Sequence, residues 1–127
     1  MPPRRLSEFA ILITARHWTA QLEWYLHHPM ALHAGLDPAI AAAVAEDREP
    51  AALQPDERAV YDFAVQLHRT GRVEDAAYAA VRALFGEQGV VDLVGVCGYY
   101  TIVAMTLNVA RVELPPGEAL PLMPRKP

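Results

Sequence analysis

The sequence predicts an all-α fold in a single domain, and two observations lead to this prediction. First, four long stretches of the 127-residue chain contain no proline, a residue that costs about 3 kcal/mol inside a helix. Second, apolar residues recur in these stretches at the three- and four-residue steps of a helix face. The composition, 53% hydrophobic and 20% charged, is that of a chain that packs a core. We expect the domain to span residues 1–114, followed by a proline-rich tail over residues 115–127 that either packs on the domain or frays.

The first predicted helix runs from about Leu6 to His28 and is ended by Pro29. On a helical wheel its apolar side chains form two stripes on opposite sides, so we expect this helix to be buried all round. Its polar residues therefore need an explanation. They are Glu8, Arg16, His17, Glu23, His27 and His28.

The remaining elements follow from capping and helix-breaking residues. Asp37 and Pro38 supply an N-cap and a first helical residue. A further helix begins after Pro55 and continues to Gly71. We then expect one helix from about Glu74 to Phe85, stopped by Gly86, and a last one from about Val90 to Ala110.

Leu93 to Ala110 is a run of 18 uncharged residues, which reaches the lower limit for crossing a bilayer. Its glycines, hydroxyl side chains and Asn108 favour a helix buried in a soluble oligomer over a single membrane anchor. Near the N-terminus, Glu8 and Arg16 bracket an apolar run that is too short for a secretory signal, so we expect no targeting segment.

The net charge and the cysteine content exclude several classes of function. A net charge of -4 argues against nucleic-acid binding, which requires a basic face. The single Cys97 excludes an intrachain disulfide, a CxxC redox pair and a thiolate zinc site, and it indicates a reducing cytoplasm. We expect Cys97 to act as a small buried hydrophobe, close to Tyr99 and Tyr100, whose hydroxyls need partners if they are buried.

The candidate chemistry lies on the first helix, where Glu8, Arg16, Glu23 and His27 fall within an arc of about 100°. Glu23 and His27 are neighbours four residues apart, which is the arrangement of a carboxylate that orients and tunes a proton-transferring imidazole. The same spacing is also common in surface pairs without a function.

Two interpretations of Arg16 stay open, because it can anchor a substrate carboxylate or neutralise the buried Glu8 and Glu23. The remaining histidines of this region, His17, His28 and His33, have no metal-ligand spacing, so we expect no metal site. His68 and Arg69 lie in the last turn of a predicted helix, where the helix dipole favours cations.

Six segments carry a resemblance to a known family: EFAILITARHW (8–18), EWYLHH (23–28), AGLDP (34–38), AVYDF (59–63), LFGEQGVVDL (84–93) and GYYT (98–101). They resemble the carboxymuconolactone decarboxylase family, which includes the alkylhydroperoxidase D-like proteins. The resemblance covers about residues 6–114 and implies an alkylhydroperoxidase D-like helical bundle that forms a homo-oligomer, a trimer or a hexamer. Members usually have helical sequence before the segment that begins here at Leu6, so part of the pocket or interface is expected to be absent or supplied by another subunit.

Peroxidase members of the family carry a Glu, two Cys and a His at fixed spacing. On this chain the pattern falls on Glu8, Ala20, Glu23 and His27, so both sulfurs are missing and thiol chemistry lacks its nucleophile. Decarboxylase members resemble this chain at Glu23 and His27.

The resemblance implies a role for each candidate residue. His27 delivers a proton and Glu23 orients it, with Glu8 in support. For the substrate, Arg16 binds a carboxylate or enolate oxygen, while His17, Trp24 and Tyr25 line the pocket. The implied activity is that of a cytoplasmic lyase without a cofactor, acting on a small lactone or organic acid by decarboxylation, isomerisation or hydrolysis. Two alternatives stay open: a non-catalytic oligomeric binding or scaffold protein, and a thiol-dependent alkylhydroperoxidase of peroxiredoxin type that uses Cys97.

Overall fold

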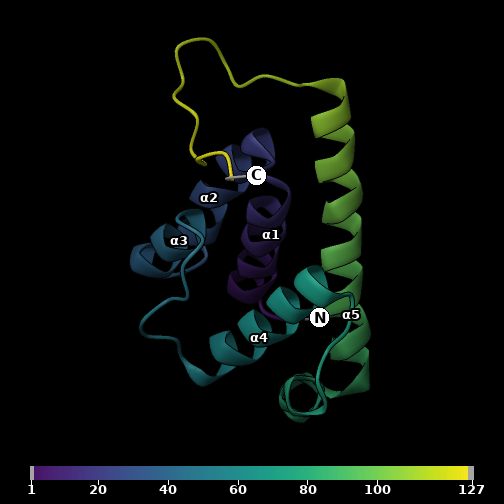
Figure 1. Cartoon of the computed structure of the whole chain (residues 1–127). Coiled ribbons are helices and arrows are strands. Elements are labelled where there is room, and N and C mark those ends of the chain that lie inside the picture. Colours follow the sequence, from purple (N-terminus) through teal and green to yellow (C-terminus); the bar gives the residue numbers. More distant parts are fainter. Residues whose placement is uncertain (1, 126–127) are drawn as a thin grey trace.

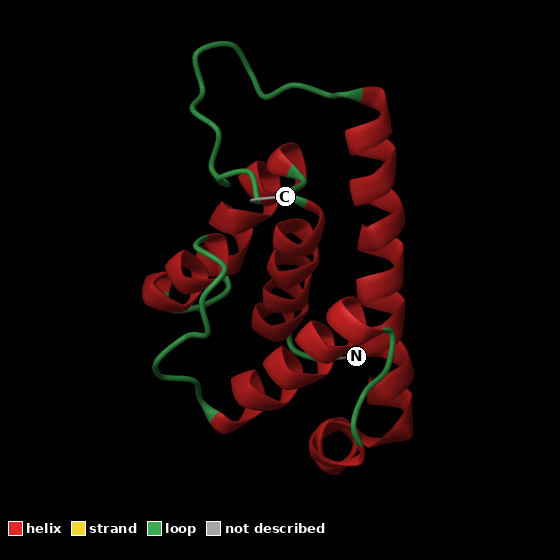
Figure 2. Cartoon of the chain, viewed as in Figure 1, coloured by secondary structure: helices red, strands yellow, loops and turns green. Residues whose placement is uncertain are grey.

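The computed structural model describes residues 2–125, and within this range the chain is helical with no strand (Figures 1 and 2). The all-α prediction is therefore confirmed. The helices, in chain order, are α1 (Arg4–Trp18), α2 (Gln21–His33), α3 (Pro38–Ala45), α4 (Pro55–Thr70) and α5 (Asp75–Ala110).

Helix α1 is the centre of the fold and contacts each of the other four helices (Figure 1). Every residue from Glu8 to Arg16 is buried. This confirms the predicted burial on all sides for the α1 part of the first predicted helix. It does not hold for the α2 part, where Leu26 of one predicted stripe is 53% exposed. The polar side chains of α1 are consequently held inside the protein, where each needs a partner.

The predicted continuous helix from Leu6 to His28 is wrong, because the chain breaks after Trp18. Thr19 adopts a left-handed conformation (φ 50°, ψ 46°), and the Ala20 amide donates to the Ala15 carbonyl oxygen at 2.9 Å. Such a cap satisfies the last carbonyl groups of a helix and reverses the chain. Helix α2 then starts at Gln21 and runs back along α1.

Pro29 also differs from its prediction, because it lies inside α2 rather than at its end. Its side chain is exposed. On that side of the helix, water can bond to the carbonyl oxygen that the missing N–H leaves without a partner.

Helices α3 and α4 begin as predicted. Asp37 caps α3 by accepting a hydrogen bond from the Ala39 amide at 2.8 Å, and Pro38 is the first helical residue. Helix α4 starts at Pro55 and ends at Thr70. It is capped by Gly71, whose φ of 75° is the left-handed conformation that favours glycine.

The two last predicted helices are joined in α5, which changes direction at Gly86 (Figure 2). The predicted stop at Gly86 is real, since its φ of 71° and ψ of -179° are not helical. However, the helix resumes at once instead of at Val90. Gly89 makes the bend possible, because a Cβ atom there would lie 2.2 Å from Cβ of Phe85.

The proline-rich tail turns back over the molecule and packs on α2 (Figure 1). Leu122 is fully buried in the core. The Gln21 side chain accepts from the Leu122 amide at 2.9 Å and donates to its carbonyl oxygen at 2.6 Å. Of the two fates expected for residues 115–127, packing is thus observed at Leu122, while residues 126 and 127 lie outside the described part.

Helix α5 carries a long exposed apolar face. By length and composition it is the one helix of the described chain that could cross a membrane, and 22% of its most apolar window is buried. The exposed large side chains on the long part of this helix, which we call the α5 face, are Val91, Val94, Tyr99, Ile102, Met105 and Val109.

We predict that Gly86→Ala destabilises the protein by about 2 kcal/mol, because a Cβ atom strains a backbone that only glycine adopts readily. The free energy of unfolding from urea titration measures the effect. Gln88→Ala, an exposed position two residues further along α5, is the control and should change it by less than about 0.5 kcal/mol. Equal stability of the two variants would refute the strain at Gly86.

Candidate active site

Four polar side chains from three helices form one cluster: Glu8 of α1, Glu23 and His27 of α2, and Tyr100 of α5. His27 Nδ1 lies 2.8 Å from Glu8 Oε2. In one continuous helix, residues 8 and 27 would be about 28 Å apart along the axis. The reversal at Thr19 is therefore what brings the carboxylate and the imidazole together.

The Glu8 contact decides which nitrogen of His27 is available for chemistry. An ionised carboxylate only accepts hydrogen bonds, so the hydrogen lies on Nδ1 and is donated to Glu8. Nε2 then carries the lone pair and can accept a proton. The imidazole is buried for the most part, with 16% of its side-chain surface exposed, so a small molecule has limited access to it.

Glu23 has a different role from the one predicted, because the partner that orients His27 is Glu8. The Glu23 side chain is 2% exposed, and neither carboxyl oxygen has a hydrogen-bond partner in the described structure. Burial raises the pKa of Glu23 from 4.5 to about 8, since a charged carboxylate loses its hydration there. At neutral pH Glu23 is thus a neutral acid that can donate a proton.

Tyr100 completes the cluster and was not among the predicted site residues. Its ring lies edge-on to His27, with 5.1 Å between ring centroids. Burial raises the pKa of Tyr100, and the carboxyl groups of Glu8 and Glu23 raise it further, so its hydroxyl stays protonated as a donor. The sequence signal was the need of a buried tyrosine hydroxyl for a partner, but only the packing of α5 on α1 and α2 brings the Tyr100 ring against His27.

The two aromatic residues predicted to line the pocket are placed differently. Trp24 is 2% exposed and belongs to the core, where it stacks on His28 with ring centroids 5.6 Å apart. Tyr25 is half-buried. Residues two apart on a helix point in nearly opposite directions, so Tyr25 does not face His27.

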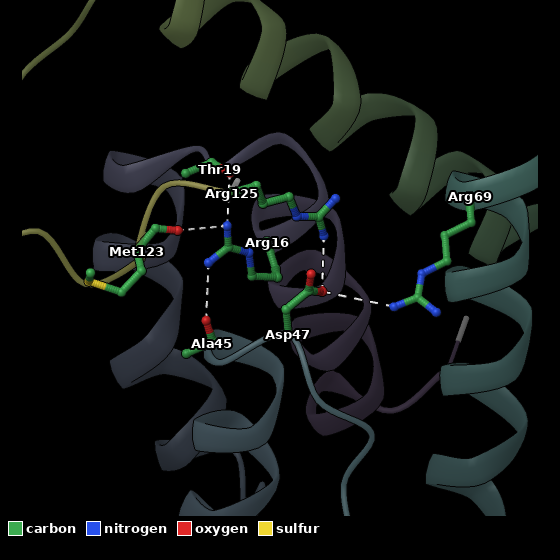
Figure 3. A network of polar contacts seen from close by, with 7 residues as sticks. All are labelled: Arg16, Thr19, Ala45, Asp47, Arg69, Met123 and Arg125. Carbon is green, nitrogen blue, oxygen red and sulfur yellow. Dashed lines mark hydrogen bonds and ion pairs between the residues drawn. The ribbon is translucent and has the colours of Figure 1, made fainter. Parts of the chain in front are cut away.

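Arg16 and His17 lie away from the cluster, about 12 Å further along α1 than Glu8. The Arg16 guanidinium donates to the carbonyl oxygens of Ala45 at 3.1 Å and Met123 at 2.9 Å, and to Thr19 Oγ1 at 2.9 Å (Figure 3). Arg16 therefore does not neutralise Glu8 or Glu23, which was one of its two interpretations, and it does not lie in the cluster as a substrate anchor. The structure instead joins it to the α3 end and the tail.

His17 packs on His68, a residue that the sequence explained by the helix dipole alone. Their rings stack with centroids 5.0 Å apart, and His68 Nε2 lies 2.8 Å from Thr14 Oγ1. The Thr14 hydroxyl already donates to the Ala10 carbonyl oxygen, so it accepts from His68. Burial and the neighbouring His17 lower the pKa of His68 to about 4, which keeps this ring neutral.

Cys97 is 1% exposed, and burial raises its pKa to about 11. A thiol in this state is not the accessible thiolate that a peroxidase needs. The described residues contain no group of three or more histidine, cysteine or carboxylate side chains that could hold a metal ion.

Comparisons with protein-family models, curated proteins and solved structures found no match to this chain.

We predict that Glu23→Gln stabilises the protein at alkaline pH. Between pH 4.5 and about 8 the unfolded chain releases the Glu23 proton while the folded chain keeps it, so the free energy of unfolding falls as the pH rises through this range. The variant should gain about 3 kcal/mol over wild type at pH 8.5 and almost nothing at pH 4. Chemical denaturation at both values measures this difference.

The control for this prediction is Glu87→Gln, because the Glu87 side chain is 74% exposed. It should show no such dependence on pH. A Glu23→Gln gain that is the same at pH 4 and pH 8.5 would mean that Glu23 is not held in its neutral form.

Proposed function

We propose that this protein is an enzyme of the carboxymuconolactone decarboxylase type that catalyses proton transfer on a small lactone or organic acid. The proposal rests on the cluster around His27 together with the sequence resemblance. His27 is the residue that accepts and delivers protons, Glu8 positions it, and Glu23 and Tyr100 donate hydrogen bonds to the substrate. The enzyme needs no cofactor for this chemistry.

The observation that carries the proposal is Glu23. A carboxyl group that is almost fully buried with both oxygens unpartnered lowers stability, because its hydration is lost and nothing replaces it. Such groups are rare in folded proteins and are concentrated at functional sites. Here the group lies one helical turn before an oriented imidazole.

The chemistry follows from the protonation states. His27 Nε2 can remove a proton from the carbon next to a carbonyl group, while the neutral Glu23 and the Tyr100 hydroxyl stabilise the oxygen on which negative charge develops. The same imidazole then returns the proton to another carbon, which is isomerisation. In decarboxylation Nε2 first takes the proton of the substrate carboxyl group. The C–C bond to the resulting carboxylate then breaks with loss of CO₂, and the imidazolium returns the same proton to the enolate carbon.

Within the described residues, no arginine hydrogen bond or ion pair involves Glu8, Glu23 or His27. Arg5 pairs with Asp56 and Glu57, and Arg16 bonds to Ala45 and Met123. Substrate oxygen atoms would therefore be bound by neutral donors. This favours a small, largely apolar lactone with one or two oxygen-bearing groups over a polyanionic substrate.

We also propose that the protein is a cytoplasmic homo-oligomer, a trimer or a hexamer as the resemblance implies. The α5 face supports self-association. Its exposed apolar side chains recur at steps of three to five residues, which keeps them on one side of the helix, as in a helix that packs against another helix. The face borders the cluster, because Tyr99 contacts Tyr100 with ring centroids 5.0 Å apart. A second copy seated there would close the His27 cluster from solvent.

A non-catalytic oligomeric binding or scaffold protein is the second candidate. The observation that favours it is the low exposure of His27 and Glu23, since a polar network can also serve only to specify packing. The two candidates differ in whether a substrate reaches Nε2.

We predict that His27→Asn lowers kcat on a small unsaturated lactone acid by about 10²–10⁴-fold, because it removes the acid–base group. The assay follows CO₂ release and loss of the unsaturated chromophore over a panel that includes a carboxymuconolactone. His33→Asn, a change of the same kind at an exposed position of α2, is the control and should keep full activity. A folded, oligomeric wild type that turns over no member of the panel would favour the binding or scaffold protein.

We predict that Ile102→Glu converts the oligomer to monomers, because it places a charge in the middle of the α5 face, where Ile102 is 60% exposed in the single chain. Light scattering at several protein concentrations measures the mass. The control is Ala42→Glu, which adds the same charge at an exposed position of α3 and should leave the mass unchanged. A monomeric wild type that partitions into phosphatidylcholine vesicles would contradict the oligomer and favour a membrane anchor.

A further inference from the structure

A second polar site lies at the other end of α1, where α1, α3, α4 and the tail meet. It is a cavity of about 30 Å³, which is room for one or two water-sized groups. The charged and titratable side chains that line it include Arg16, His17, Asp47, His68, Arg69 and Arg125. None of the residues of the His27 cluster lines this cavity.

The cavity has an excess of positive charge. Asp47 accepts from Arg125 at 3.0 Å and lies 3.9 Å from Arg69 (Figure 3). Arg48, which also lines the cavity, is already bonded to Glu46. One carboxylate thus faces three guanidinium groups, those of Arg16, Arg69 and Arg125.

Of the three guanidinium groups, only that of Arg16 makes no ion pair with a carboxylate of the described residues. It is 4% exposed, its bonds go to two carbonyl oxygens and a hydroxyl, and its Nε has no partner in the described structure. Burial lowers the pKa of Arg16, and the like charge of Arg125 lowers it further. Asp47 opposes this shift, but it is one carboxylate shared with Arg69 and Arg125. A buried cation that is only partly neutralised is costly to keep and is stabilised by an anion.

The histidines do not add to this charge. Burial lowers the pKa of His17, and Arg125 and Arg69 lower it further. The pKa of His68 is about 4. Near neutral pH both rings are therefore neutral hydrogen-bonding groups beside the guanidinium groups.

We propose that this cavity binds a small oxyanion, a carboxylate or phosphate group, between the guanidinium groups of Arg16, Arg69 and Arg125. The planar forks of arginine match two oxygens of either group. Asp47 already pairs with Arg125 and Arg69, so it competes with the ligand for these guanidinium groups. The bound anion would link α1, α4 and the tail, so its binding stabilises the fold.

The test uses the full chain and two probes, inorganic phosphate and acetate, titrated at constant ionic strength against sodium chloride. The thermal midpoint and isothermal titration calorimetry report binding. We expect one of the probes to raise the midpoint and to give a measurable Kd where chloride does not. The probe with the lower Kd identifies the ligand as a phosphate or a carboxylate. The proposal is overturned if chloride stabilises the protein as much as both probes.

Three variants make the test specific. Arg69→Gln should weaken binding by about tenfold, whereas Arg82→Gln should leave the Kd within about twofold; both side chains are 58% exposed in wild type. Asp47→Asn should tighten binding by about threefold to tenfold, since it removes the competing carboxylate. Asparagine also tolerates the left-handed φ of 59° at this position.

Equal loss of affinity in Arg69→Gln and Arg82→Gln, or weaker binding by Asp47→Asn, would show that the arginines only form structural ion pairs. His27→Asn separates this site from the proposed enzyme activity, because it should bind the anion as wild type does. The test of anion binding is therefore independent of the test of catalysis.

Discussion

The burial of α1 on all sides is the constraint on which the rest of the structure depends. Every other helix packs on it, so the polar side chains of this one helix are distributed to different interfaces. Glu8 faces α2, where it meets His27. Arg16 faces the α3 end and the tail. One central helix thus supplies an anionic group to one site and a cationic group to another.

Each of the two sites contains a buried ionisable group that is not fully satisfied. Glu23 has no hydrogen-bond partner on either oxygen, and Arg16 lacks one at Nε. Groups of this kind reduce the free energy of unfolding, because desolvation is not offset by new bonds. Two such groups on adjacent helices are readily understood if each one interacts with a ligand: a proton-accepting substrate oxygen for Glu23 and an oxyanion for Arg16.

The tail and α5 complete the molecule in different ways. The tail covers the core with Leu122 and holds Gln21 and Arg16 by backbone hydrogen bonds, although its composition alone is that of an extended chain. Helix α5 packs one side on α1 and leaves the other side apolar and exposed. An exposed apolar stripe of that length marks an interaction surface, and in the proposed oligomer a second copy covers it.

The sequence by itself determined the helical class, the caps at Asp37 and Gly71, the stop at Gly86 and the full burial of α1, because these depend on local conformational preferences and on the period of apolar residues. It also identified Glu8, Glu23 and His27 as the residues to explain. The tertiary structure alone decided how they meet. Position 19 is a threonine and not a proline or glycine, so the sequence pattern predicts a helix that continues through it. In a continuous helix the carboxylate next to His27 is Glu23, whereas the structure places Glu8 there. For the same reason the contacts of His27 with Tyr100 and of Asp47 with Arg125 were not predicted. Each joins residues more than 70 positions apart, and only the packing of the whole chain brings them together.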